Sequence, residues 1–201
     1  MSARGQSQMH VWAPEVILDD GSSKEVTGEK YTYGVIWSGD GNLSRDAAYK
    51  IPASNTSGYD WANRTYINYT NDFVTFTEPY LYFQNDYTGT VITEIDASIT
   101  KADGKYYLFF KNEAGGALDI SAAVSSSLKP LSFEVLNDGK YISRTDEQDV
   151  ACGVEGSFQM KIDGMWWMIA DHYGNTNINA RTNFWAWSSK QIDASPEFWK
   201  E

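Results

Sequence analysis

Apolar and polar positions along this chain form short runs that are typical of β-strands. Segments rich in Tyr, Phe, Trp, Ile, Val and Thr are separated by clusters of Gly, Asn, Asp and Ser. The clearest of these segments are residues 31–37, 105–110 and 165–170. No stretch keeps a helical period over several turns. The pattern therefore predicts an all-β fold.

Two Asp-Gly pairs, Asp103-Gly104 and Asp163-Gly164, stand directly before the second and third aromatic segments. Asp-Gly supplies the positive φ angles that tight hairpin turns need. Each pair therefore predicts a hairpin in which the aromatic segment is the second strand.

Three short acidic signatures precede the aromatic segments. They read Trp-Ala-Pro-Glu at 12–15, Ile-Asp-Ala-Ser at 95–98 and Val-Glu-Gly-Ser at 154–157. A repeated β-unit with a carboxylate at the same place in each copy indicates blades arranged around an axis, where the acids converge. Converging carboxylates indicate acid–base chemistry, and the neighbouring aromatic residues indicate a sugar.

The repeat divides a single domain, residues 1–201, into units at about 10–80, 91–136 and 152–190. A closed propeller needs about four to eight such sheets. Three alone leave strand edges and apolar faces exposed, which natural proteins avoid. We therefore expect a partial β-propeller that belongs to a longer protein.

The composition argues against two classes of binding partner. The net charge of −11 argues against nucleic acid, whose phosphates require clustered Lys and Arg. No apolar run approaches the roughly 18 residues of a membrane span, so no membrane partner is expected. With 42% hydrophobic residues the chain can bury a sizeable core, and with one cysteine it can form no internal disulfide.

The signatures together resemble glycoside hydrolase family 43. The segments that carry the resemblance are 12–15, 71–76, 95–98, 105–113 and 154–156, in the family's order. The resemblance implies a five-bladed β-propeller that cleaves arabinose- or xylose-containing plant polysaccharides and inverts the anomeric centre. It also implies an extracellular or periplasmic location, although Met1 to Gln8 lack the apolar core of a signal peptide.

The resemblance assigns roles to individual positions. Glu155 matches the general acid, and Asp96 matches the acid that modulates the pKa of its neighbour and orients the sugar. Trp12 matches an aromatic residue near the sugar-binding subsite. The family's general base is an Asp upstream of the Trp-Ala-Pro segment, but no residue from Met1 to Val11 is acidic. We therefore expect the general base to be missing from this chain.

Each candidate also has a structural interpretation. The alternative for Asp96 is a strand-start residue that accepts hydrogen bonds from turn amides. Trp12 and Trp37 are candidate platforms for the apolar face of a sugar ring, yet most of the 8 tryptophans must pack between sheets. The repeat points Glu15 toward the axis, where it is a candidate substitute for the base. The family, however, gives this position no role in proton transfer.

No cofactor is expected. His10 and His172 are too few and too isolated to form a metal cluster. A structural cation such as calcium is possible in the family, but the sequence identifies no ligands for one.

Three classes of function remain open. The chain is a glycosidase segment, a noncatalytic carbohydrate-binding propeller, or a protein-interaction propeller with exposed hydrophobic patches. The catalytic interpretation requires Asp96 and Glu155 to meet in one solvent-reachable pocket. The polar insertion at 38–63 is where we expect the choice of sugar and linkage to be made.

Overall fold

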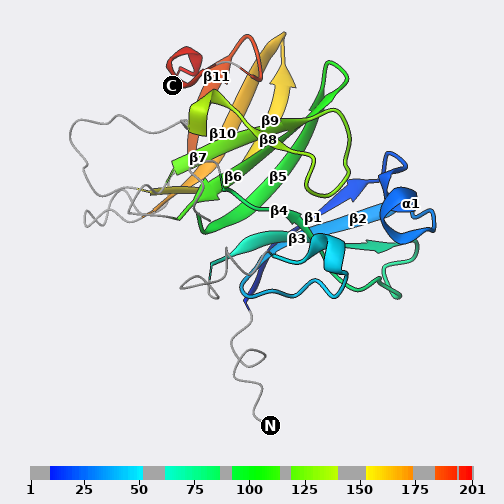
Figure 1. Ribbon diagram of the computed structural model, residues 1–201. Coiled ribbons are helices and arrows are strands. Elements are labelled where there is room, and N and C mark those ends of the chain that lie inside the picture. The colour runs from blue at the N-terminus through cyan, green and yellow to red at the C-terminus, as the bar shows by residue number, and fades with distance from the viewer. Residues whose placement is uncertain are drawn as a thin grey trace.

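A computed structural model describes residues 10–51, 62–86, 92–113, 119–139, 153–173, 184–193 and 195–200. Within them the strands form three antiparallel sheets (Figure 1). The first contains β1 (Val11–Leu18), β2 (Tyr33–Gly39), β3 (Arg64–Thr70) and β4 (Tyr80–Phe83) in sequence order. The second contains β5 (Glu94–Ala102), β6 (Lys105–Asn112), β7 (Asp119–Ser125) and β8 (Glu134–Val135). The third contains β9 (Gly153–Ile162), β10 (Met165–Tyr173) and β11 (Phe184–Ser189).

The prediction of an all-β fold is confirmed, and three such sheets are consistent with part of a propeller. Both predicted hairpin turns are also confirmed. Asp103 and Asp163 each have φ of 49°, and the glycines that follow have φ of 78° and 82°. These positive angles match the right-handed twist of the flanking strands.

Helices are short in the described part of the chain. The six-residue helix α1 (Ser22–Thr27) connects β1 to β2, and 3-10 turns occur at Ala47–Tyr49, Asn137–Gly139 and Pro196–Phe198. The sequence did not predict α1, because six residues are too few for a helical period to be visible. Among the described residues no helix is long and apolar enough to cross a membrane.

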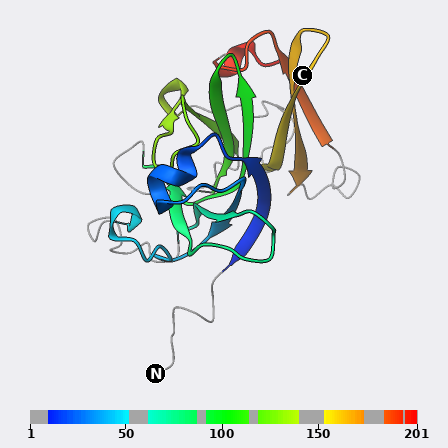
Figure 2. The same ribbon diagram turned by 90° about the vertical axis from the view of Figure 1, so that its right-hand side faces the viewer.

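The second sheet lies between the other two, as the views in Figures 1 and 2 agree. The first strands of the three sheets follow one another in space, with β5 in contact with both β1 and β9. Every sheet therefore begins at a common central region and adds its later strands outward.

Two hydrophobic clusters occupy the spaces between the sheets, and β6 contributes to both. Tyr106, Leu108 and Phe110 pack toward the first sheet, whereas Tyr107 and Phe109 pack toward the third. This alternation follows from the two-residue period of a strand. The aromatic run in β6 is continuous because both faces of the second sheet are buried.

The outer face of the first sheet is partly covered by the insertion that follows β2. Ile51 packs against Tyr66 and Leu81 of the sheet, with Leu43 and Tyr49 beside them. Residues 52–61 of the insertion lie outside the described residues.

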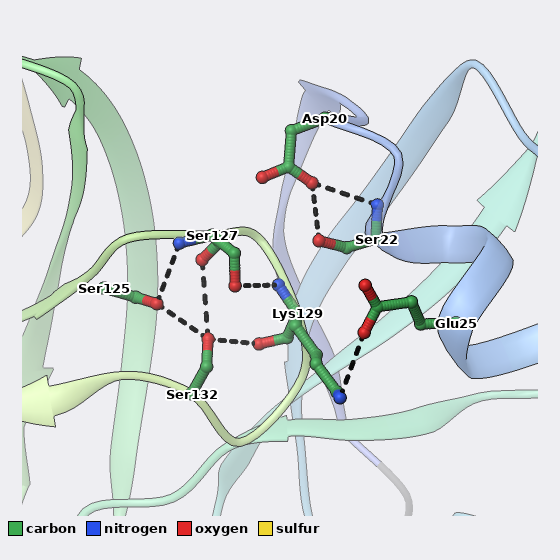
Figure 3. A network of polar contacts seen from close by, with 7 residues as sticks. All are labelled: Asp20, Ser22, Glu25, Ser125, Ser127, Lys129 and Ser132. Carbon is green, nitrogen blue, oxygen red and sulfur yellow. Dashed lines mark hydrogen bonds and ion pairs between the residues drawn. The ribbon is translucent and has the colours of Figure 1, made fainter.

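Polar contacts fasten the first sheet to the second at α1. One carboxylate oxygen of Asp20 accepts the Ser22 N–H at 3.0 Å, and the other accepts the Leu128 N–H from the segment after β7 at 2.9 Å. Lys129, in the same segment, reaches Glu25 of α1 at 3.1 Å. Figure 3 shows α1 against this segment, whose serines bond to one another.

Candidate active site

A β-bulge interrupts the first strand of every sheet. The register shifts between Trp12 and Glu15 in β1, between Ile95 and Ser98 in β5, and in β9 opposite the Ile169–Asp171 step of β10. In each case three residue steps on the first strand face two on its partner. A bulge bends the strand and redirects its side chains, and bulges are frequent beside active sites.

The bulges correct the alignment of acids expected from the sequence. Residues with positive φ mark equivalent positions: Ala13 at 47°, Asp96 at 57° and Gly156 at 59°. Measured from these positions, Glu15 lies two residues later and Glu155 one residue earlier. The three carboxylates therefore do not occupy the same place in the repeat. The expectation was wrong because the signatures were aligned by their letters, whereas the extra residue of each bulge sets the true register.

Asp96 nevertheless lies at the junction of all three sheets. Its backbone N–H donates to Ser38 Oγ of the first sheet at 3.1 Å. Its carboxylate Oδ2 accepts the Gly156 N–H of the third sheet, also at 3.1 Å. Asp is one of the few residues that tolerates the left-handed conformation this position requires.

Glu155 directly precedes Gly156 and carries the second carboxylate of the site. Its Oε2 lies 2.8 Å from Lys111 Nζ, and its side chain is 35% exposed. The same ammonium lies 2.6 Å from Glu113 Oε1. The structure thus brings Asp96 and Glu155 together at a place that solvent reaches.

The charges of this group act on Asp96. Burial raises the pKa of Asp96, and the negative charge of Glu155 raises it further. The ammonium of Lys111 and the Gly156 N–H act in the opposite direction, but the net effect is a raised pKa. Asp96 is therefore held in a setting that favours its protonated form more than water does.

Trp12 shares the side of the sheet that faces Asp96. It stands opposite Ser38 in the β1–β2 ladder, and directly opposite residues point to the same face. Trp12 is 40% exposed, and its ring stacks on His10 with centroids 4.3 Å apart. His10 is held in turn by Asp40, whose Oδ2 lies 3.2 Å from His10 Nδ1.

Trp37 lies elsewhere. It neighbours Ser38 in β2 and so points to the opposite face. Its ring packs on Tyr66 at 5.2 Å, and its Nε1 donates to Asn68 Oδ1 at 2.7 Å. The structure brings Trp12 to the Asp96 side of the sheet but does not bring Trp37 there.

Glu15 binds the neighbouring sheet. The Ile99 N–H of β5 donates to its Oε1 at 3.2 Å. Burial raises the pKa of Glu15 to about 7, although the Ile99 N–H opposes this shift. In the next pair of sheets Ser98, the residue equivalent to Glu15, contacts Gln159 Oε1 of β9 at 3.3 Å. This position therefore joins one sheet to the next.

Sequence reasoning missed Lys111, Glu113 and the His10–Asp40 pair. A usable signal existed for Lys111, because a lysine that directly follows five consecutive aromatic or aliphatic residues of a doubly buried strand requires a counter-charge. Nothing in the sequence identified which carboxylates would provide it. In the described ranges no group of three or more His, Cys, Asp or Glu side chains is arranged to hold a metal ion.

Comparison with known families supports the resemblance to family 43. The model of Glyco_hydro_43_rel, described as a probable glycosyl hydrolase domain, matches residues 2–194. An alpha-L-arabinofuranosidase from Bifidobacterium longum subsp. longum is 34% identical over 108 residues, which is 53% of this chain and 9% of that protein. The chain thus spans a small part of this curated relative.

Solved structures share the fold at low sequence identity. A thermostable family-43 glycoside hydrolase has a TM-score of 0.55 and 17% identity, with 94% of this chain and 53% of that chain covered. An alpha-L-arabinofuranosidase from Lactobacillus brevis has a TM-score of 0.57 and 13% identity, with 96% and 56% covered. A family 117 glycoside hydrolase from Zobellia galactanivorans has a TM-score of 0.55 and 14% identity, with 100% and 60% covered. This chain spans little more than half of each.

Proposed function

The chain belongs to the family of probable glycosyl hydrolase domains related to glycoside hydrolase family 43, and from that premise we propose that its sheets are blades of a five-bladed propeller glycosidase. The substrates are plant polysaccharides that contain arabinose or xylose, and hydrolysis inverts the anomeric centre. The matching arabinofuranosidase supports arabinose, whereas xylose rests on the family resemblance alone. An extracellular or periplasmic location suits such substrates.

One observation carries the proposal: the hydrogen bond from Gly156 N–H to the Asp96 carboxylate, which places Asp96 beside Glu155. In the proposed reaction Glu155 gives its proton to the leaving glycosidic oxygen as the bond from that oxygen to C1 breaks. Asp96 modulates this proton transfer and orients the sugar. The exposed face of Trp12 stacks on the sugar ring.

Inversion also needs a carboxylate that activates water from the opposite face of the ring, roughly 6.5–9.5 Å from the acid. The resemblance places this base upstream of the Trp-Ala-Pro segment, and residues 1–11 include no Asp or Glu. We therefore propose that the isolated chain binds sugar but hydrolyses it slowly. Turnover of an aryl arabinofuranoside at ordinary glycosidase rates would contradict this expectation.

Sugar binding tests the site without requiring turnover. We expect arabino- or xylo-oligosaccharides to bind the chain, and Trp12→Ala to weaken binding by about tenfold, because loss of an aromatic platform costs about 1 kcal/mol or more. Isothermal titration calorimetry measures this. Trp37→Phe is the matched control and should bind as the wild type does. Equal loss in both variants would remove Trp12 from the proposed site.

Azide tests the chemistry, because a small anion can attack C1 in place of activated water. With an oligosaccharide and azide, we expect NMR to detect a glycosyl azide of inverted configuration. The rate should fall at least tenfold in Glu155→Gln, which has no proton to give to the leaving oxygen. Glu134→Gln, on an exposed side chain of β8, is the control.

A noncatalytic carbohydrate-binding propeller is the second candidate. The contact between Glu155 and Lys111 favours it, because an ion pair of 2.8 Å already engages the Glu155 carboxylate within the protein. Sugar binding with no glycosyl azide in any condition would select this alternative.

A further inference from the structure

A buried lysine bridges two carboxylates beside Asp96. Lys111 is the residue of β6 that stands opposite Ile95 in the β5–β6 ladder, and its side chain is 4% exposed. Its ammonium contacts Glu155 from β9 and Glu113 from the segment that follows β6. This one cation therefore links the second sheet to the third at the candidate site.

The presence of a second carboxylate, that of Glu113, beside Lys111 has a physical explanation. A buried ammonium is strongly destabilising unless it is paired, because removal from water costs several kcal/mol per ion. One carboxylate is enough to neutralise it. If Glu155 were the sole partner, protonation of Glu155 would leave the charge of Lys111 buried and uncompensated. With Glu113 also in contact at 2.6 Å, the ammonium keeps a partner when Glu155 takes up a proton.

We propose that Lys111 is a positioning residue that fixes the Glu155 carboxylate beside Asp96, and that Glu113 is the second anchor which lets Glu155 change its protonation state without stranding the lysine. The catalytic meaning of this arrangement rests on the proposed function. The electrostatic arrangement itself does not depend on turnover and can be measured separately.

The charges of Lys111 and Glu113 shift the pKa of Asp96 in opposite directions. Burial and Glu155 raise its pKa, Lys111 lowers it, and Glu113 raises it. These two residues can therefore be altered one at a time while the titration of a third, Asp96, is observed.

Other charged groups near the pair must stay constant in such an experiment. Asp171 of β10 has its Oδ2 3.7 Å from the position a Cβ would take on Gly156. Glu94 of β5 is fully buried and accepts the Thr65 N–H at 3.2 Å. Asp40 is engaged with His10 on the first sheet. None of these residues is changed in the test.

The experiment follows the Asp96 carboxyl carbon by NMR as pH is varied. Lys111→Met should move the Asp96 titration to higher pH, because a nearby positive charge is lost. Glu113→Gln should move it to lower pH, because a negative charge is lost while the lysine remains. Lys111→Arg keeps the charge and should restore a titration close to that of the wild type. Lys105→Met, at the exposed start of β6, is the control and should leave the titration unchanged.

Opposite shifts in the first two variants support the proposal, and a shift of the same sign or no shift in Glu113→Gln overturns it. Should Lys111→Met fail to fold, Glu113→Gln and Lys111→Arg still decide the question. Opposite shifts without sugar binding would leave the inference standing and remove the proposed function. Sugar cleavage without these shifts would remove the inference alone.

Discussion

At the scale of single residues, Glu15 differs from the site carboxylates in what its burial achieves. It accepts the Ile99 N–H across the boundary between the first two sheets. Because desolvation raises its pKa from 4.5 to about 7, the folded protein retains a proton that the unfolded chain releases in this interval. The folded state consequently loses stability as pH rises from 4.5 to 7, and no further loss comes from this group above that range.

Glu15→Gln should remove this pH dependence. Glutamine retains an oxygen that can accept the Ile99 N–H but cannot ionise. The variant should be more stable than the wild type at pH 8 by on the order of 2–3 kcal/mol, and similar to it at pH 4. Urea unfolding at the two pH values measures the difference, with Glu134→Gln as control. A wild type that is equally stable at both values, with no gain in the variant, would contradict the assignment.

The sequence predicted which residues belong to the site better than it predicted where they lie in the repeat. Asp96 and Glu155 were identified from the motifs that surround them, and the structure brings them together. The alignment of Glu15, Asp96 and Glu155 with one another was wrong, because a bulge adds a residue without any distinctive letter: Ala13 and Gly156 occupy the same place as Asp96. The partners of Lys111 are distant in sequence or fixed by packing, so no local pattern could identify them.

At the scale of elements, α1 holds two sheets together through its N-terminal side. Burial by itself would raise the pKa of Asp20, but hydrogen bonds from the Ser22 hydroxyl, the Leu128 N–H and the Ser22 N–H outweigh it, and the pKa is lowered below 3.8. The stability that Asp20 contributes is therefore complete above its ordinary pKa and is lost as pH falls through the lowered value.

Asp20→Ala should destabilise the protein by about 1–2 kcal/mol at pH 7, because it leaves the Leu128 and Ser22 N–H groups without this acceptor. Lys129→Ala, which breaks only the exposed ion pair with Glu25, should cost about 0–1 kcal/mol. Thermal or urea unfolding compares the two. A larger loss from Lys129→Ala would show that the ion pair, and not the hydrogen bonds to Asp20, joins the sheets.

Elements with a strong local signal were predictable, and those determined by distant contacts were not. The Asp-Gly hairpins and the aromatic strands depend on turn geometry and on a two-residue period, both of which the sequence displays. The helix α1 depends on its caps at Gly21 and Gly28 and on its contact with the second sheet. The bulges depend on strand pairing, which a single sequence does not reveal.

At the scale of the whole molecule, apolar side chains remain exposed on the two outer sheets. In the first they include Val16 and Leu18 of β1, and in the third Phe158 of β9 and Phe184 of β11. Phe158 occupies the position at which Glu15 and Ser98 reach the next sheet. These exposed faces also match what a protein-interaction propeller would present.

The isolated chain should therefore bind an apolar dye such as ANS and self-associate as its concentration rises. Phe158→Gln together with Phe184→Ser should reduce both effects, because contiguous exposed apolar surface drives association. Dye fluorescence and sedimentation velocity measure them, and Lys161→Gln on the same strand is the control. Unchanged dye binding and sedimentation in the double variant would show that another surface binds the dye and drives self-association.

The hydrogen bonds that fix Asp96 to Ser38 and Gly156 have a consequence for how the molecule matures. The contact of Asp96 with Gly156 requires the second and third sheets to dock, and the bond from the Asp96 N–H to Ser38 requires the second to dock on the first. An assembly arrested before the sheets dock would show a normal β-sheet spectrum and yet lack the contact between Asp96 and Gly156. Ligand recognition is thus a more demanding measure of native structure in this chain than its secondary-structure content.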